Sequence, residues 1–272
     1  MTVEQPDAER LVGRVRPKPP ISGVDRTFAV LDACATSRRT VSLGDLVQLT
    51  GIPKSTLHRL CLRLTQQGAL DHHPDGYRIG PRLFGLGAVN PTIQRLRTAS
   101  MPLLHALSSS TGHVANLAVL HRDQVLLLDE VFALEKPFPR MVGATLPLHA
   151  TALGKVLLAT QPVAIRQALV GSSVLPAFTR NTVVRPELLL EQLAAAARSG
   201  IAHSREEWRL GFAGVAASVR THEEPRAAVA LVGIPRAVDT ERYAGAVRNA
   251  ADALADALKR PVIRDASPWA GT

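Results

Sequence analysis

Residues 41–70 constrain the fold of this chain more than any other stretch, because they carry the signals of two helices joined by a tight turn. Ser42 is a suitable N-cap for the first helix, and Asp45 places a carboxylate in its first turn. Gly51 stands where a left-handed residue ends a helix. Pro53 can begin the next helix without losing a backbone hydrogen bond. We therefore predict a helix-turn-helix.

The second helix of this pair has one apolar face and one polar face. Its apolar residues recur at i, i+3, i+4 and i+7 and so face inward: Leu57, Leu60, Cys61 and Leu64. Hydroxyl groups and cations dominate the opposite face, which carries Lys54, Ser55, Thr56, His58, Arg59, Arg63 and Gln66. Hydroxyls suit phosphate oxygens and arginine suits guanine edges, which is how a recognition helix meets the major groove. The alternative is an ordinary helical pair with a solvated basic face.

A short hairpin is expected directly after this helix. Residues 70–73 and 76–79 have strand-like patterns and flank a Pro-Asp-Gly turn. A hairpin in this place is a wing, from which His72 and Arg78 can touch backbone phosphates. The adjacent histidine pair has no cysteine or carboxylate at ligand spacing, so it is a weak signal for a metal site.

The chain is long enough for two domains and has the composition of a globular protein. Its 272 residues are 46% hydrophobic and 20% charged. The net charge of +9 and the pI near 10.5 favour an anionic partner. The excess is spread out, with a net charge of +4 in residues 1–90 and +5 in residues 91–272. Charge alone therefore does not identify the nucleic-acid-binding part, whereas the pattern on one helix face does.

Cysteine usage and hydropathy both favour a cytoplasmic protein. The two cysteines, Cys34 and Cys61, fall on the inward faces of expected helices, so buried thiols rather than a disulfide are predicted. No apolar run approaches the ~20 residues that span a bilayer, and we expect no membrane association. The N-terminus lacks the apolar core of a secretory signal.

The first domain is expected at residues 21–84, after a polar, Pro-rich arm at residues 1–20 that we expect to be disordered. A helix is predicted at residues 22–35. Its packing face would consist of Val24, Phe28, Leu31 and Ala35. A helical linker at residues 85–95 would then lead to the second domain at residues 96–262.

Strands and helices are mixed in the second domain. Apolar runs predict strands at residues 113–121, 124–131, 141–148, 215–219 and 227–234, of which the first two form a hairpin in a covered sheet. Helical signals appear at residues 93–109, 150–159, 186–199 and 240–258. The last helix carries a seam of Ala244, Val247, Ala251, Leu254 and Leu258.

Three motifs in a fixed order match a known family. They run from Val24-Asp25-Arg26 through Gly80-Pro81-Arg82-Leu83, from Leu146-Pro147-Leu148-His149 to Ala159, and from Glu206-Glu207 through Leu210-Gly211 to Val215-Ala216-Ala217. With them the chain resembles IclR-type bacterial transcription regulators over nearly its whole length. The resemblance implies an α+β protein with an N-terminal winged helix-turn-helix and a C-terminal α/β GAF-like effector-binding domain.

The same resemblance implies a ligand-responsive regulator, a repressor in our interpretation, that binds double-stranded operator DNA as a homodimer or homotetramer. Its effector would be a small metabolite, and no cofactor or metal is expected. The residues that we assign to DNA are Arg38, Ser42, Lys54, Ser55, Thr56, His58, Arg59, Arg63 and Arg78.

The effector pocket that the resemblance implies maps onto Ala144, Leu146, Gly154, Ser204, Gly214, Leu231 and Gly233. The sequence departs from the family pattern here. Leu231 and Gly233 stand where carboxylate-sensing relatives offer hydroxyls, and a buried carboxylate without partners is costly. We therefore expect an aromatic or apolar acid rather than a short keto acid. A degenerate pocket without an effector is the alternative.

Two other classes of function fit the sequence less well than regulation. An enzyme in the second domain lacks the usual signals, because no Gly-x-Ser-x-Gly occurs and Gly154-Lys155 lacks the preceding glycine of a phosphate-binding loop. His149 has no paired nucleophile, so a hydrogen-bonded structural histidine is expected. Glu206 and Glu207 would point oppositely on a strand. An interaction module that has lost DNA binding disagrees with the intact polar helix face.

Overall fold

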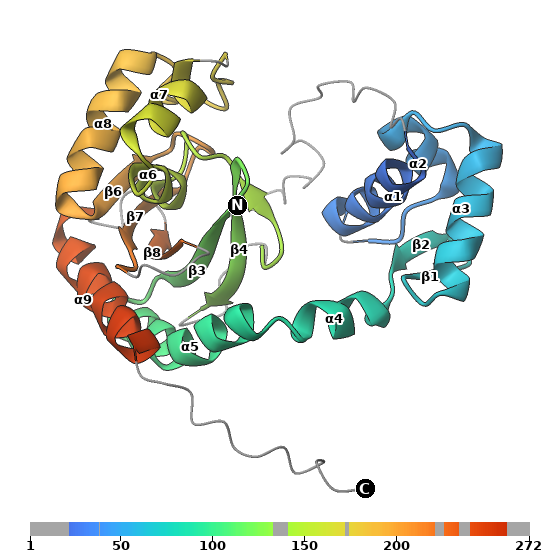
Figure 1. The fold of residues 1–272 in the computed structure, drawn as a ribbon, viewed down its shortest axis with the longest axis horizontal. Coiled ribbons are helices and arrows are strands. Elements are labelled where there is room, and N and C mark those ends of the chain that lie inside the picture. Colours follow the sequence, from blue (N-terminus) through green and yellow to red (C-terminus); the bar gives the residue numbers. More distant parts are fainter. Residues whose placement is uncertain are drawn as a thin grey trace, which may run out of the picture. The chain divides into compact units, whose positions relative to one another are not determined.

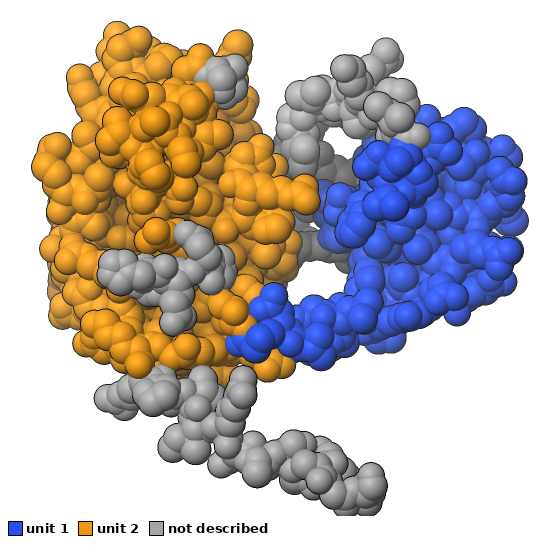
Figure 2. Space-filling model, viewed as in Figure 1, with its two compact units in different colours: residues 1–91 blue, residues 92–272 orange. Residues whose placement is uncertain are grey.

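The computed structural model describes residues 22–37, 39–132, 141–171, 174–220, 226–233 and 240–259. The chain divides into two compact units, residues 1–91 and residues 92–272 (Figure 2). Among the described residues, the helices are all too short or too polar to span a lipid bilayer.

The first unit packs helices against a two-stranded hairpin (Figure 1). Its elements are α1 (Gly23–Ser37), α2 (Leu43–Thr50), α3 (Lys54–Gln66), β1 (Leu70–His73), β2 (Gly76–Ile79) and α4 (Pro81–Ala88). The helix-turn-helix and the wing are therefore confirmed. One apolar core joins α1, α2 and α3 to the hairpin, and it includes both cysteines. Burial raises the pKa of Cys34 to about 12 and that of Cys61 to about 11, so both thiols stay protonated at neutral pH.

Local capping chemistry fixes both ends of α2. The Ser42 hydroxyl accepts a hydrogen bond from the Asp45 N–H, and the Asp45 carboxylate accepts one from the Ser42 N–H. This reciprocal pair is a capping box. Gly51 follows the helix in the left-handed conformation, at a φ of 68°. Pro53 occupies the N-cap position of α3, so this helix begins one residue later than predicted.

The face of α1 that packs inward differs from the predicted face. Val24 and Phe28 are 66% and 60% exposed, whereas Val30 and Cys34 are buried. Ala35 is also exposed, and only Leu31 of the predicted face packs partly against the core. Val30 and Cys34 are four residues apart, like Val24 and Phe28, so helical spacing allows either face. Packing against α2 selects one of them, and the predicted face is wrong.

The wing is tied to the start of the helix-turn-helix. β1 and β2 pair antiparallel, from Leu70 opposite Ile79 to His73 opposite Gly76. Val41 and Tyr77 exchange two backbone hydrogen bonds of 2.8 and 2.9 Å. A Cβ on Gly76 would overlap the Val41 carbonyl, and its φ of 138° disfavours any other residue.

The second unit is an antiparallel sheet with helices on both faces (Figure 1). Its elements are α5 (Pro91–Thr111), β3 (Val114–His121), β4 (Gln124–Val131), β5 (Thr145–Leu146), α6 (Ala152–Ala159), α7 (Val163–Gly171), α8 (Pro186–Ser199), β6 (Ile201–Arg205), β7 (Ala213–Ser218), β8 (Ala227–Gly233) and α9 (Thr240–Lys259). The described strands form one six-stranded sheet in the order β5-β4-β3-β8-β7-β6. Sequence reasoning missed α7 and β6, and only two residues of the strand expected at 141–148 pair in the sheet.

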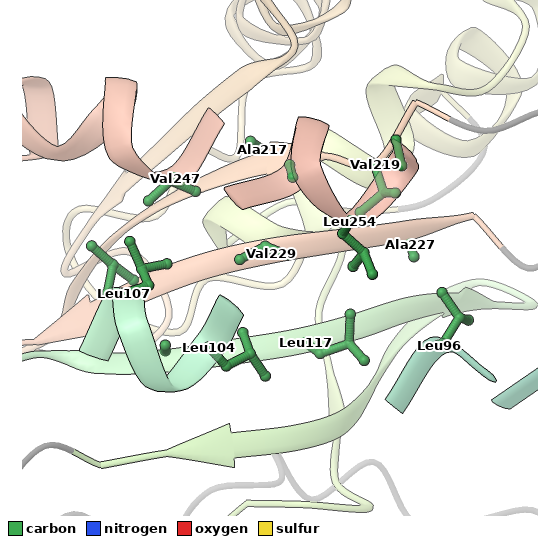
Figure 3. Close-up of a cluster of buried hydrophobic side chains, with 14 of the residues drawn as sticks. Leu96, Leu104, Leu107, Leu117, Ala217, Val219, Ala227, Val229, Val247 and Leu254 are labelled. Carbon is green, nitrogen blue, oxygen red and sulfur yellow. The ribbon is translucent and has the colours of Figure 1, made fainter. Parts of the chain in front are cut away.

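The two faces of this sheet differ in the size of their side chains. Branched residues such as Leu117, Val229 and Val215 cover one face, where they pack against α5 and α9 (Figure 3). Val247 and Leu254 of the predicted α9 seam lie in this cluster. The other face carries mainly alanines, namely Ala118, Ala202, Ala216, Ala228 and Ala230, beneath α6 and α8. Small side chains leave space above this second face.

A β-bulge interrupts the pairing of β3 with β4. Leu117 lies opposite Asp129 and Ala118 lies opposite Leu127, so Leu128 has no partner across the ladder. Beyond the extra residue, the side chains of β4 that would have faced one side of the sheet face the other. Asp129 accepts two hydrogen bonds of 2.9 Å from Arg97 of α5. Glu130 instead accepts backbone N–H bonds from residues 141 and 142.

Helix α6 lies unusually close to the segment before it. A Cβ on Gly154 would lie 2.6 Å from the Pro147 carbonyl oxygen and would overlap Leu148. Thr151 caps the helix by accepting a hydrogen bond from the Gly154 N–H at 3.0 Å. Its hydroxyl also donates to the Pro147 carbonyl at 2.9 Å. Only a glycine at position 154 allows this approach.

A buried ion pair joins α6 to the turn after β6. The Lys155 Nζ lies 2.6 Å from both carboxylate oxygens of Glu207, and the Lys155 side chain is 2% exposed. Burial lowers the pKa of Lys155, and the Glu207 carboxylate offsets part of this effect. The hydroxyls of Thr179 and Thr182 donate to the Glu207 carbonyl. The pair thus fixes where residues 206–212 lie relative to α6.

The two glutamates of this turn correct an expectation from the sequence. Glu206 lies beyond β6 with a φ of 56°, so it is in a turn and not on a strand. Its carboxylate accepts a hydrogen bond from the Gly211 N–H at 2.7 Å. Glu207 contacts Lys155 instead, so each carboxylate has a different structural partner.

We predict that Gly154→Ala destabilises the second unit by about 1–3 kcal/mol, because the added methyl group forces α6 away from Pro147 and Leu148. Urea unfolding monitored by circular dichroism measures this change. Gly245→Ala in α9 is the matched control, because a Cβ there meets nothing within 4 Å. It should stabilise the helix by up to about 1 kcal/mol. Equal effects of both substitutions would contradict the prediction.

We also predict that Glu207→Gln lowers the free energy of unfolding by about 3–5 kcal/mol, because it leaves the Lys155 charge buried without a counter-charge. Replacing both members, as Lys155→Met with Glu207→Leu, should recover most of the loss. Asp256→Asn is the control, since it breaks an exposed pair with Lys259 and should change little. A loss no larger than that of the control would rule out the structural role of the buried pair.

Candidate functional site

The exposed face of α3 is the first candidate site. Lys54, Ser55, His58 and Arg59 are exposed and line a shallow depression together with Leu43 of α2. Arg63 is also exposed, and its Nη1 lies 3.4 Å from the Gln66 side-chain oxygen. Thr56 is half-buried. The helix sequence contains no acidic residue, so its cations face no carboxylate on their own element. This surface can approach a polyanion.

Other residues assigned to DNA occupy different places. Arg78 is exposed on the wing, 3.8 Å from the Asp71 carboxylate. The exposed His72 ring lies against the Tyr77 ring. Ser42 has a capping role, because its hydroxyl also donates to the Asp45 carboxylate at 2.8 Å. Arg38 lies outside the described residues.

The second candidate site is a cavity of about 90 Å³ above the alanine-rich face of the sheet. Its walls come from β3, β4, β6, β7, β8, α6, the segments before α6 and the turn after β6. The lining residues are Val114, Asn116, Leu127, Glu130, Phe132, Met141, Leu146, Ala150, Thr151, Ala152, Leu153, Ser204, Trp208, Arg209, Phe212, Ala213, Gly214, Ala230 and Val232. Most of these are apolar, and a few polar groups converge among them, as is typical of small-molecule sites.

Three of the predicted pocket residues line this cavity: Leu146, Ser204 and Gly214. The Ser204 hydroxyl donates to the Ala150 carbonyl at 3.1 Å. A Cβ on Gly214 would lie 3.4 Å from Val232, so the glycine adds a little space. Ala144 is not among the lining residues, and its carbonyl accepts a hydrogen bond from the Leu127 N–H.

The other three assignments to the cavity wall are wrong. Leu231 is fully buried on the opposite face of the sheet, in the cluster with α5 and α9. Gly233 is two residues further along β8 and therefore faces the same side as Leu231. Ala230 and Val232 are the residues of this strand that face the cavity. A shift of one residue along a strand exchanges its two faces. Gly154 serves the close packing of α6 and does not line the cavity.

Sequence reasoning found Ser204 but missed the other polar groups of the cavity. Arg209 is the one cation among the described lining residues, and its guanidinium lies 5.0 Å from the centre of the Phe212 ring. Asn116 is a buried amide in the middle of β3. Its position as the only polar residue between Val114 and Leu120 was the signal that could have drawn attention to it. No comparable signal marked Arg209, which lies in a turn.

Neither unit offers a metal site within the part of the chain that the structure describes. No group of three or more His, Cys, Asp or Glu side chains there is arranged to hold an ion. His149 is a structural residue, since its Nε2–H donates to the Pro176 carbonyl at 2.9 Å and its ring lies near Phe178. Burial lowers the pKa of His149.

Both units match known families. Residues 23–74 match the IclR helix-turn-helix domain, and residues 92–256 match the bacterial transcriptional regulator IclR C-terminal family. The glycerol operon regulatory protein of Streptomyces coelicolor is 33% identical over 248 residues, which cover 90% of this chain and 96% of that protein. The transcriptional repressor IclR of Escherichia coli is 31% identical, covering 78% of this chain and 80% of its own length.

A solved structure agrees with these matches. The IclR homolog of Microbacterium hydrocarbonoxydans, complexed with 4-hydroxybenzoate, is 28% identical and superimposes with a TM-score of 0.77. The similarity covers 88% of this chain and 99% of that one. Taken with the helix-turn-helix and the cavity in the second unit, these matches show that the chain belongs to the IclR family of ligand-responsive, DNA-binding transcriptional regulators.

Proposed function

We propose that this regulator is a repressor that reads its operator with the exposed face of α3 and releases it when an aromatic or apolar carboxylic acid occupies the cavity of the second unit. Repression is supported by the names of two relatives, the E. coli repressor and the acetate operon repressor of Salmonella typhimurium. The protein would act in the cytoplasm, where its operator is. The observation that carries the effector class is an apolar cavity with a single described cation.

The proposed DNA contacts are those of the α3 face and the wing. Lys54, His58, Arg59 and Arg63 place positive charge or hydrogen-bond donors on one exposed face, and Ser55 adds a hydroxyl. Phosphate contacts would position the helix, and an arginine that reaches a guanine edge would supply specificity. Arg78 on the wing would add a phosphate contact.

We propose assembly as a dimer or tetramer through exposed apolar residues of the first unit. The described helix α4 has no buried residue, and Phe84, Leu86 and Val89 at and just beyond it are 75%, 61% and 72% exposed. Val24 and Phe28 of α1 are exposed as well. Large apolar side chains that are exposed on a helix surface are typical of protein–protein contacts. A second copy would supply the second recognition helix that operator specificity requires.

The proposed effector follows from the chemistry of the cavity. Apolar walls stabilise a ligand in proportion to its buried apolar area, at about 25 cal/mol per Å². Arg209 would pair with one carboxylate, and a second carboxylate would find no second cation among the described lining residues. The complex of the M. hydrocarbonoxydans relative with 4-hydroxybenzoate supports an aromatic monoacid. The alternative is a regulator whose cavity has no effector.

We predict that Arg59→Ala weakens specific operator binding by about 1–3 kcal/mol at fixed salt, because it removes a contact to a base edge or a phosphate. The operator is first selected from a random DNA pool and then titrated by fluorescence anisotropy. Arg198→Ala, which changes an exposed arginine of α8, is the matched control and should bind like the wild type. Unchanged binding by a folded Arg59→Ala protein would remove Arg59 from the reading face.

Repeating the titration of the wild type with one half-site tests the assembly, since a dimer should lose most of its affinity for DNA.

We predict that Arg209→Gln weakens binding of 4-hydroxybenzoate by roughly ten-fold to a hundred-fold, because a charge-assisted hydrogen bond contributes about 1.5–3 kcal/mol. The methyl ester of the same acid carries no charge, so its affinity should be nearly the same for the variant as for the wild type. Fluorescence of Trp208, which lines the cavity, can follow the titration. Arg198→Gln is the control. If the wild-type protein binds no apolar acid, the alternative without an effector is favoured; if the variant binds normally, the carboxylate is held elsewhere.

A further inference from the structure

Asn116 is a buried polar side chain whose amide oxygen has no hydrogen-bond partner in the described structure. It lies on β3, is 6% exposed and lines the cavity. Its side-chain oxygen is fully buried and accepts no hydrogen bond from any described residue. Most buried polar groups in proteins have a partner, so an exception beside a cavity calls for a physical reason.

Three other polar side chains of the cavity wall have hydrogen-bond partners within the protein. Ser204 donates to the Ala150 carbonyl, and the Thr151 hydroxyl bonds both the Gly154 N–H and the Pro147 carbonyl. Glu130 accepts from the backbone at residues 141 and 142. Asn116 therefore differs from its neighbours in this respect.

The sheet register explains why the facing side chains do not donate to the Asn116 oxygen. Asn116 lies opposite Glu130 on one side and Ala230 on the other, and Ala216 follows Ala230 across the next strand. The alanine side chains have no polar atom, and the Glu130 carboxylate already binds the loop at residues 141 and 142. The cavity that Asn116 lines is the place from which a ligand can supply a donor to this oxygen.

We propose that Asn116 is a specificity-determining residue that recognises a neutral hydroxyl group on the effector, at the end away from its carboxylate. Arg209 belongs to the turn between β6 and β7, whereas Asn116 lies on β3, on the other side of β8. The two polar groups thus stand on separate strands with small apolar residues between them. A hydroxyl can donate to the amide oxygen or accept from the amide nitrogen. This inference rests on the proposed binding of an apolar acid in the cavity.

The free protein provides a test that needs no ligand. Asn116→Leu replaces the amide by an apolar group of similar size, so the second unit of the full-length variant should melt about 2–6 °C higher than that of the wild type. Asn249→Leu, the same exchange at an exposed position of α9, should leave the melting temperature nearly unchanged. A lower melting temperature for Asn116→Leu would mean that the amide supports the fold, and the inference would be wrong.

Ligand discrimination provides the second test. The probes are matched pairs, benzoate with 4-hydroxybenzoate and phenylacetate with 4-hydroxyphenylacetate, titrated by calorimetry into the full-length protein. The wild type should bind the hydroxylated member of at least one pair ten-fold or more tightly than its partner. Asn116→Leu should abolish this gap, and Asn249→Leu should keep it. Asn116→Ala, which adds no volume, serves if the leucine variant does not fold.

The possible outcomes separate this inference from the proposed function. If the wild type binds both members of each pair equally, Asn116 does not select a hydroxyl, while the acid-binding cavity stands. If the gap persists in Asn116→Leu, another group reads the hydroxyl and the inference is likewise wrong. If no probe binds to the wild type, both the effector class and the inference are overturned.

Discussion

The buried ion pair of Lys155 and Glu207 is the interaction on which the geometry of the second unit depends. It joins α6, which covers the alanine-rich face of the sheet, to the turn that carries Trp208 and Arg209. Two buried charges held 2.6 Å apart tolerate little movement, because separating them would leave each one unpaired in the protein interior. The cavity therefore has walls fixed by electrostatics on one side and by the close packing of Gly154 on the other.

The features that the sequence predicted best are those whose causes are local. The α2–turn–α3 motif rests on Ser42, Asp45 and Gly51, and each acts on backbone groups within a few residues of itself. The wing likewise follows from a turn signal between two short strands. The inward face of α1 was predicted wrongly, because Val24 and Phe28 have the same spacing as Val30 and Cys34. Only contact with other helices distinguishes those two faces.

The cavity was harder to predict, because its walls depend on which strands become neighbours. Leu231 was assigned to the cavity from a family pattern, but in the structure it lies on the opposite face of the sheet. An assignment that is shifted by one residue along β8 has this effect. Asn116 and Arg209 are distant in sequence, and they line the same cavity only because of the strand order in the folded sheet. The small residues at alternate positions, Gly214 and Ala216 on β7 and Ala228 and Ala230 on β8, were the most useful sequence signal, since small side chains on one face leave room for a ligand.

The β-bulge at Leu128 has a mechanical consequence. Asp129 and Glu130 are consecutive, and beyond the extra residue they face opposite sides of the sheet. Asp129 accepts hydrogen bonds from Arg97 of α5. Glu130 accepts hydrogen bonds from the backbone of residues 141 and 142 beside the cavity. Both attachments come from consecutive residues of a strand that is paired with β3, so a displacement of the backbone at one residue also shifts the other. The loop that borders the cavity and the first helix of the second unit are thereby coupled through the same two residues of β4.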